Sequence, residues 1–131
     1  MIADRKRFEA TIAAFDAANA EDPNLDEGQP KELRYAQRMS DMLERFAPDA
    51  AEAVQLAVRA QHIQRWKTPR SSYPMDRQGY LQWRTGLYKF HAETAGRIMA
   101  ENGYDAETLD RVTTAVGKKG IKVNAETQLP A

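Results

Sequence analysis

Hydrophobic residues recur along most of this chain at spacings of three and four, the period of a helix with one buried face. No stretch alternates between apolar and polar residues with the period of two that a half-buried strand would show. Strong helix formers dominate five stretches, which span residues 3–20, 31–46, 48–66, 77–102 and 105–118. The pattern predicts an all-α protein, a single-domain bundle of about five helices.

Two of these predicted helices indicate where the core should lie. Residues 48–66 are apolar around most of the helix circumference, which places that helix at the centre of the bundle. In the helix of residues 31–46, the predicted core face carries Tyr35, Met39, Met42, Leu43 and Phe46.

Short polar segments separate the predicted helices. Proline, asparagine and glycine mark residues 21–30 as a loop, and two prolines mark residues 67–75 as another. Asp76 is the predicted N-cap of the fourth helix, because its carboxylate can accept a backbone N–H of the first turn. Gly103 is expected to end the same helix.

The composition fits one globular domain. The chain has 131 residues, 42% of them hydrophobic, which is enough for a single domain over residues 1–131 with its core in residues 3–118. Residues 120–131 carry no pattern and are predicted to be a loose tail. The absence of cysteine excludes disulfides and thiolate chemistry. The charged N-terminus and the lack of a long apolar run argue against a signal peptide and a membrane helix, so the expected location is the cytoplasm.

The charges balance over the chain as a whole but not along it. Residues 59–91 read RAQHIQRWKTPRSSYPMDRQGYLQWRTGLYKFH and contain both histidines and both tryptophans of the chain. Seven basic residues and one acid, Asp76, give this segment a formal charge of +6, against −6 for the remainder. Basic groups interleaved with aromatic rings suit an anion, and phosphate before others. This segment is therefore the candidate for function.

Helical spacing predicts two groups of basic and aromatic residues in this segment. A flank of the third helix carries Arg59, His62 and Trp66. An apolar stripe of the fourth helix carries Arg77, Arg84 and His91. A charge buried on an apolar stripe costs several kcal/mol unless an anion accompanies it. The anion is either a carboxylate of the protein, for which the candidates are Glu32, Asp41, Asp76 and Glu93, or the phosphate of a ligand.

A structural interpretation stays open beside this one. Arginines that line a helix usually pair with acids or lie along the surface with hydrated heads. The aromatic rings that we expect in the core, rather than as a platform for bases, are Trp66, Tyr80, Trp83 and Phe90. Signatures of other sites are missing from the sequence, which has no nucleophile elbow, no glycine-rich phosphate loop and no HExxH pair.

Three runs of sequence resemble a known family. They are RYAQRMSDML, then RAQHIQRWKTPRSSYPMDRQGYLQWR, and then KFHAETAG with ENGYD, and the resemblance covers residues 30–120. On these runs the chain is identified as a member of the domain of unknown function 4202 family. It is also similar, at a further step, to the HD superfamily of helical metal-dependent phosphohydrolases. The resemblance implies an HD-like helical fold.

The metal site of the HD superfamily is matched only in part. His62 matches the histidine of the His-Asp doublet, and His91 matches the histidine that opens a later helix. Ile63 stands in place of the doublet aspartate, Tyr35 stands in place of an early histidine, and the final aspartate has no counterpart. Two histidines leave a divalent ion with too few anionic ligands. We therefore expect neither a metal nor another cofactor.

Three functions stay open at this point. The favoured one is a domain that binds a phosphate-bearing small molecule in a pocket lined by arginine and histidine. The second is a divergent metal-dependent phosphohydrolase, in which His62 or His91 acts as general acid or base. The third is a module that binds RNA, or an acidic patch of another protein. The predicted ligand-binding residues are Arg34, Arg38, Arg59, Arg65, Trp66, Arg70, Tyr73, Arg77 and Arg84.

The C-terminal end carries one more expectation. The family pattern continues into a further helical stretch with a Leu-Glu-Asp sequence, so the chain resembles a C-terminally shortened member. A bundle that lacks a helix leaves an apolar face open. We expect a homodimer to cover that face, and we expect no membrane partner.

Overall fold

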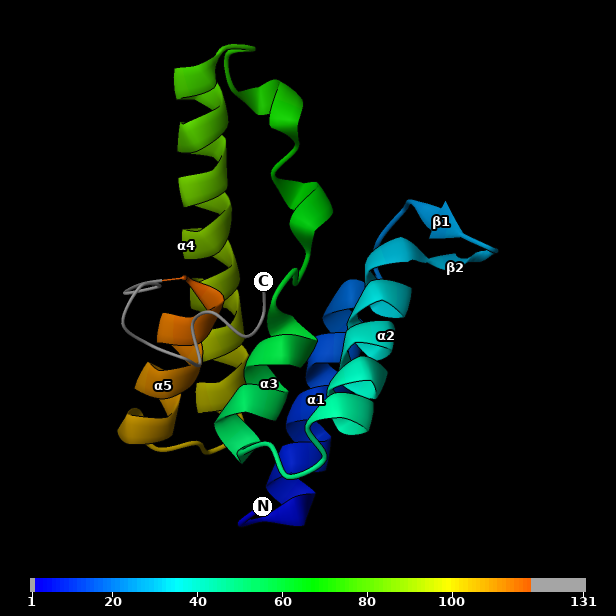
Figure 1. Ribbon diagram of the computed structural model, residues 1–131, viewed down its shortest axis with the longest axis vertical. Coiled ribbons are helices and arrows are strands. Elements are labelled where there is room, and N and C mark those ends of the chain that lie inside the picture. Colours follow the sequence, from blue (N-terminus) through cyan, green and yellow to red (C-terminus); the bar gives the residue numbers. More distant parts are fainter. Residues whose placement is uncertain (1, 119–131) are drawn as a thin grey trace.

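The computed structural model describes residues 2–118, whose regular elements are helices and one short hairpin (Figure 1). The long helices are α1 (Arg5–Asn19), α2 (Lys31–Phe46), α3 (Glu52–Ala60), α4 (Arg77–Glu101) and α5 (Ala106–Val116). The shorter elements are the strands β1 (Leu25–Asp26) and β2 (Gln29–Pro30), and the 3-10 turns η1 (Arg65–Lys67) and η2 (Arg70–Ser72). The predicted all-α class is confirmed. The predicted tail, residues 120–131, lies outside the described residues.

Aspartate side chains begin three of the helices. Asp4, Asp76 and Asp105 each accept a backbone N–H from the first turn of α1, α4 and α5, at 3.1, 2.7 and 2.8 Å. Each bond satisfies one of the donors that a helix start leaves open. Asn102 follows the end of α4, and Gly103 comes next at φ +88°, a left-handed conformation that suits glycine. The predicted N-cap at Asp76 and the predicted end at Gly103 are both confirmed.

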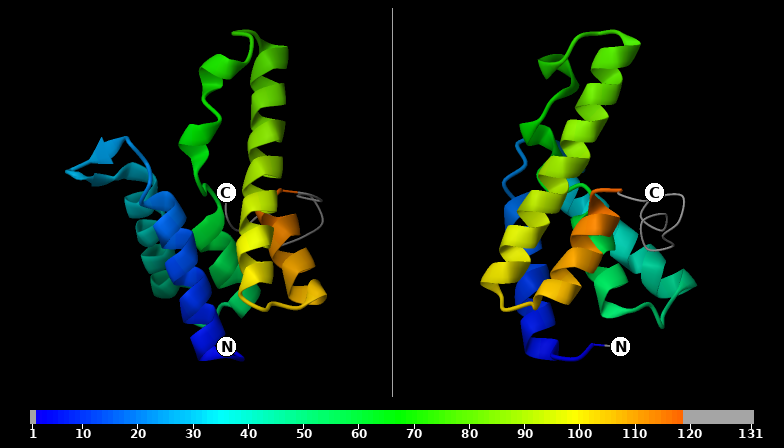
Figure 2. Two further views of the ribbon diagram at one scale, coloured as in Figure 1. Left: turned by 180° about the vertical axis from the view of Figure 1, so that it is seen from behind. Right: turned by 90° about the vertical axis from the view of Figure 1, so that its left-hand side faces the viewer.

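The core surrounds α3. Seen from behind in Figure 2, this helix lies between α1 and α2 on one side and α4 and α5 on the other. Leu56 of α3 is fully buried and belongs to one cluster with Phe15 of α1, Met99 of α4 and Val112 of α5. The predicted central position of the third helix is therefore confirmed. None of the described helices is both long enough and apolar enough to cross a bilayer.

The third helix is shorter than predicted. It covers Glu52–Ala60, whereas the apolar pattern predicts residues 48–66. Beyond its end the chain runs in turns, and Gln64 takes a left-handed conformation with φ 52°. The buried side chain of Asn19 holds this turn, because its Oδ1 accepts the backbone N–H of Gln64 at 2.9 Å. The prediction was wrong here because a contact with α1, distant in sequence, ends the helix.

The predicted core face of α2 is partly wrong. Met42 and Phe46 are 49% and 80% exposed, whereas Glu32 and Ala36 are buried. The other predicted positions are half-buried, and they are Tyr35, Met39 and Leu43. The buried face of α2 thus runs through a glutamate rather than along the apolar stripe. A buried glutamate is more typical of a functional site than of a hydrophobic core.

Residues 65–86 project beyond the bundle, and we call them the arm (Figure 1). The arm consists of η1, η2 and the first turns of α4. Trp83 connects its two sides, because the indole Nε1 donates to the carbonyl oxygen of Thr68 at 2.9 Å. Five basic residues and one acid give the arm a formal charge of +4. The arm therefore presents most of the positive charge of residues 59–91 away from the core.

Candidate functional site

The structure divides the predicted site residues among three places. Arg34, Arg38 and Arg59 pair with acids, and His62 and His91 lie beside each other in the bundle. The other predicted residues lie on the arm, and they are Arg65, Trp66, Arg70, Tyr73, Arg77 and Arg84. Arg65 is the first residue of the arm, and its charge acts on both histidines. Arg59, His62 and Trp66 do not share a helix flank, because α3 ends before His62. On α4, His91 is buried while Arg77 and Arg84 are exposed, so these two charges need no buried anion. One pocket does not contain the whole predicted set.

Three of the predicted ligand-binding arginines already hold carboxylates. Arg59 donates from Nε and Nη2 to the two carboxylate oxygens of Asp16, at 2.9 and 2.7 Å. Arg34 and Arg38 both donate to Asp26 in the β1–β2 hairpin, each at 3.3 Å. The bidentate Arg59–Asp16 pair fixes geometry as well as charge. These guanidinium groups therefore connect α3 to α1 and the hairpin to α2.

The Arg59–Asp16 pair should contribute a coupling of about 1–2 kcal/mol to the free energy of unfolding. Its side chains are 15% and 24% exposed, so water screens this pair less than it screens a surface pair. The measurement is a double-mutant cycle in denaturant with Arg59→Met and Asp16→Asn. The more exposed Arg38–Asp26 pair is the control, and its coupling should stay below about 0.5 kcal/mol. Equal coupling in the two cycles would contradict a structural role particular to Arg59.

The central residues form what we call the histidine cluster, which comprises Glu32, Tyr35, His62, Arg65, His91 and Lys118. His91 is 2% exposed, and its Nδ1 lies 2.8 Å from the carbonyl oxygen of Ile63. A carbonyl oxygen can only accept, so Nδ1 carries the proton and Nε2 keeps its lone pair. Burial, together with the charges of Arg65 and Lys118, lowers the pKa of His91 to about 4. The imidazole is therefore neutral at pH 7.

His62 is held between two rings. Its imidazole stacks on Tyr35, with centroids 4.4 Å apart and planes 7° apart, and its centroid lies 6.1 Å from that of His91. Burial and the charge of Arg65 lower the pKa of His62 to about 3. The 3.9 Å between its Nδ1 and Oε1 of Glu32 is too long for a hydrogen bond, and a neutral imidazole makes no ion pair. Both histidines of the cluster are thus neutral bases at neutral pH.

Three members of the cluster were missed as site residues in the sequence, and they are Glu32, Tyr35 and Lys118. Oε1 of Glu32 has no hydrogen-bond partner among the described residues, and burial raises the pKa of this carboxyl. Nζ of Lys118 is closed to solvent and also lacks a partner within residues 2–118, and burial lowers its pKa. Their sequence signals are weak, because acids at a helix start and lysines at a helix end are ordinary capping charges. Glu32 is predictable only as a counter-ion and Lys118 only as a last-turn lysine.

Arg65 and Lys118 make the cluster electropositive. The charge of each lowers the pKa of both histidines. Arg65 forms no ion pair with any carboxylate in the described part of the chain. Glu32 is the one acid of the cluster, and its raised pKa weakens the compensation that it can offer. Two cations thus face one acid at a partly buried site.

On the arm, guanidinium groups lie over aromatic rings instead of pairing with acids. Arg70 lies 5.8 Å from the ring centre of Tyr80 and 5.9 Å from that of Trp83. Arg65 lies 5.6 Å from the ring centre of Trp83, and Arg84 lies 5.8 Å from that of Tyr80. The rings predicted to lie in the core are not buried, and they are Trp66, Tyr80, Trp83 and Phe90. That prediction was wrong because three of them belong to the projecting arm.

The chemistry of the histidine cluster favours anions over cations. No group of three His, Cys, Asp or Glu side chains within residues 2–118 is placed to hold a metal ion. Ile63 serves the cluster through its backbone carbonyl, which lies 2.8 Å from Nδ1 of His91. Neutral imidazoles can accept a proton, and arginine and lysine can donate to oxyanions. The cluster therefore suits anion binding or general acid–base chemistry.

The bundle and the cluster together define an all-helical domain with a partly buried His/Tyr/Glu centre beside an arginine and a lysine. The chain belongs to the family described as Domain of unknown function (DUF4202), whose model matches residues 9–129. No curated protein and no solved structure matches the chain. The family membership predicted from the three sequence runs is confirmed. The more distant likeness to the HD superfamily stays an interpretation.

Proposed function

We propose that this domain binds a phosphate-bearing small molecule at the histidine cluster without a metal ion. The observation that carries the proposal is Lys118, whose Nζ is closed to solvent and has no hydrogen-bond partner among the described residues. A buried ammonium without a partner is unfavourable by several kcal/mol, and a bound anion removes that penalty. Phosphate fits well because its oxygens accept several charge-assisted hydrogen bonds at once.

Four members of the cluster have a role around such an anion. Arg65 offers a planar pair of donors to two phosphate oxygens, and Lys118 offers a donor to a third. The anion would raise the pKa of His62 and of His91, because it stabilises their protonated forms. Binding is then linked to proton uptake, so affinity should rise as the pH falls below 7. Trp66, next to Arg65 on η1, is the candidate ring for a nucleobase if the ligand is a nucleotide.

The experiment is a thermal-shift screen followed by titration calorimetry. The compounds are inorganic phosphate, nucleotides and phosphorylated sugars, each with and without manganese. A ligand at about 100 times its dissociation constant adds roughly 2.7 kcal/mol to the free energy of unfolding. We expect stabilisation by a phosphorylated compound in the absence of manganese. A screen without any shift would overturn the proposal, and a shift that requires manganese would favour a metal-dependent enzyme.

Arg65→Gln should weaken the binding of the phosphate compound found in this screen by roughly 10- to 100-fold. The reason is that charge-assisted hydrogen bonds are worth about 1.5–3 kcal/mol. Arg5→Gln is the matched control, because it removes the same charge from a side chain that is 68% exposed near the N-terminus. Calorimetry at one pH and one salt concentration compares the two variants. Equal losses in both would show a general charge effect rather than a site.

A divergent phosphohydrolase is the second candidate, and the proton state of His91 favours it. Nδ1–H is held by the carbonyl of Ile63, so Nε2 is a free base at neutral pH. In this reaction, water would attack phosphorus as the base takes its proton, and the bond to the leaving oxygen would break. Arg65 and Lys118 would stabilise the charge that develops on the phosphoryl oxygens. Release of phosphate from p-nitrophenyl phosphate tests this, and an unchanged rate in His91→Gln would remove His91 from the mechanism.

The remaining expectations concern location and partners. A cytoplasmic location, an HD-like ancestry and a homodimer stay predictions. A module that binds RNA or an acidic protein finds support in the arm, which combines a formal charge of +4 with Tyr80 and Trp83. Phosphate contacts make affinity for RNA fall steeply with salt, so a flat salt dependence would count against RNA.

A further inference from the structure

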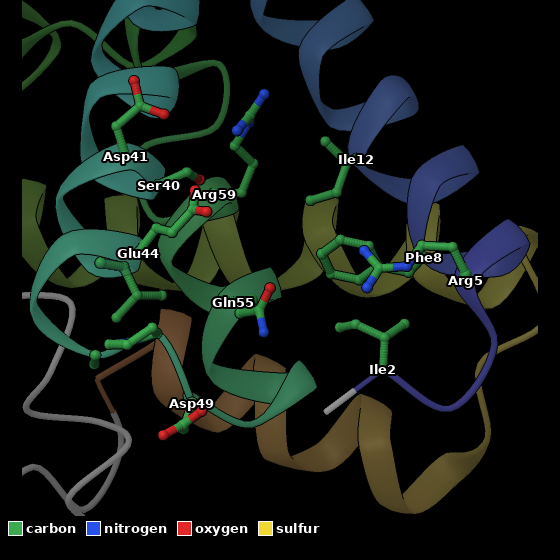
Figure 3. Close-up of a pocket in the computed structure, with 13 residues that line it drawn as sticks. Ile2, Arg5, Phe8, Ile12, Ser40, Asp41, Glu44, Asp49, Gln55 and Arg59 are labelled. Atoms are coloured by element: carbon green, nitrogen blue, oxygen red, sulfur yellow. The ribbon is translucent and has the colours of Figure 1, made fainter.

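We propose that copies of this chain associate head to tail, with the arm of one copy docked in a groove between α1, α2 and α3 of the next. Figure 3 shows this groove, which has a volume of about 780 Å³. Its apolar lining comprises Ile2, Phe8, Ile12, Leu43, Ala47 and Pro48. Open apolar surface of this kind favours a partner that can bury it. The groove lies outside the histidine cluster, so the proposal does not depend on phosphate binding.

Acidic side chains border the same groove. Asp41, Glu44 and Asp49 line it on the side of α2 and of the turn that follows (Figure 3). None of the three forms an ion pair with another residue of the described chain. The two arginines of the lining, Arg5 and Arg59, each pair with an acid of α1. The groove thus combines apolar surface with uncompensated negative charge, and a basic partner with exposed apolar groups would complement it.

The arm has that complementary combination. Met75, Leu81 and Tyr80 are 76%, 48% and 41% exposed. Arg77 and Arg84 lie four residues before and three residues after Leu81, so the three side chains share one face of α4. Neither arginine pairs with a carboxylate of a described residue. Arginine beside exposed methionine, leucine and tyrosine is typical of a protein interface.

The exposed apolar residues gather at these two places. Six large hydrophobic residues are exposed in the described part of the chain, of which three lie on the arm. Two others, Met42 and Phe46, lie on α2, and Phe46 falls between the groove residues Leu43 and Ala47. The arm projects from one end of the bundle, and the groove is lined by residues near the N-terminus at the other end (Figure 1). A chain therefore cannot fill its own groove, and a contact between two different surfaces repeats from copy to copy.

A nucleic acid explains these surfaces less well than a second copy does. A phosphate backbone would use the arginines of the arm, but it would leave Met75 and Leu81 exposed. It would also leave the acids of the groove without a partner. A second copy covers the apolar groups of both surfaces and neutralises both sets of charge.

Charge reversal followed by sedimentation velocity tests the proposal on the full chain. The arm variant is Arg77→Glu with Arg84→Glu, and the groove variant is Asp41→Lys with Glu44→Lys. We expect the average mass of the native chain to rise with concentration and each variant to stay monomeric. A mixture of the two variants should associate again, because a reversed arm then meets a reversed groove. The control, Glu107→Lys with Asp110→Lys, changes the same charge on α5 and should associate like the native chain.

Four results would overturn the proposal. The first is a native chain that stays monomeric at about 1 mM, where even a weak association would be visible. The second is a mixture that stays monomeric although circular dichroism shows both variants to be folded. The third is a groove variant that still associates while the arm variant does not, which would indicate contact between two arms. The fourth is single-stranded RNA that binds the native chain but not the arm variant, without self-association, which would assign the arm to nucleic acid.

Discussion

Lowering the pH from 7 to 5 should reduce the free energy of unfolding by about 2–4 kcal/mol. His62 and His91 are the only histidines of the chain, and their pKa values are lowered to about 3 and about 4 in the folded protein. Between these values and the ordinary pKa near 6.5, the unfolded chain binds more protons than the folded one. Stability is therefore complete above about pH 6.5 and is lost as the pH falls toward the folded pKa values.

The size of this loss is set by how firmly each ring is buried. His91 is 2% exposed, so it should contribute nearly the whole of its ~2 kcal/mol at pH 5. His62 retains 30% exposure of its side chain, so water reduces its share. Glu32 acts in the opposite direction, because its pKa is raised and protonation then favours the folded state. The positive charges of Arg65 and Lys118 oppose protonation of both imidazoles.

Denaturant unfolding at half-unit steps between pH 5 and 7 measures this dependence. In the native chain, each buried histidine adds a slope of up to about 1.4 kcal/mol per pH unit below 6.5. His62→Gln should remove one of the two contributions, because glutamine does not titrate. The same slope in the native chain and in the variant would contradict the lowered pKa of His62. A stability that stays constant down to pH 5 would contradict the burial of both rings.

The helices and their ends could be predicted because local residues determine them. Asp76 and Gly103 bound α4 through contacts within one turn, and the apolar circumference of the third helix places it in the core. The early end of α3 could not be predicted, because Asn19, forty-five positions before Gln64, holds the turn. The exposure of Phe46 could not be predicted either, since the apolar pattern does not show which stripe of α2 meets a neighbour.

The candidate site was predictable in its two histidines and not in its surroundings. The rings of His62 and His91 lie beside each other, with centroids 6.1 Å apart, and Tyr35 stacks on His62. The sequence does not show which arginines can bind a ligand, because this depends on acids from other elements. Asp16 and Asp26 form ion pairs with three of the candidate arginines. Periodicity cannot give such pairings, which depend on how the helices pack. A basic segment in a sequence therefore indicates a region of positive electrostatic potential. Only the fold distinguishes the arginines that pair with acids from Arg65, which forms no ion pair with a described residue.

Gly79→Ala should lower the free energy of unfolding by about 1–3 kcal/mol and displace the arm. A Cβ at this position would overlap the carbonyl oxygen of Pro74 and lie 2.8 Å from its carbonyl carbon. That oxygen cannot simply move away, because it accepts a hydrogen bond at 2.9 Å from Arg70. The substitution must therefore push the segment before α4 off the helix or bend the start of the helix itself.

Tryptophan fluorescence reports on this displacement, because both tryptophans of the chain lie on the arm. We expect the emission of Gly79→Ala to shift to longer wavelength as Trp83 loses its contact with Thr68. Gly86→Ala is the graded comparison and should change less, since its Cβ would meet only the hydroxyl end of a tyrosine side chain, at 2.9 Å. Gln82→Ala, on an exposed turn of the same helix, should change neither quantity. Equal effects in the two glycine variants would mean that the backbone of Pro74 does not hold the arm against α4. The position of the arm would then depend on its stacked rings and guanidinium groups, and Arg70→Ala should release it instead.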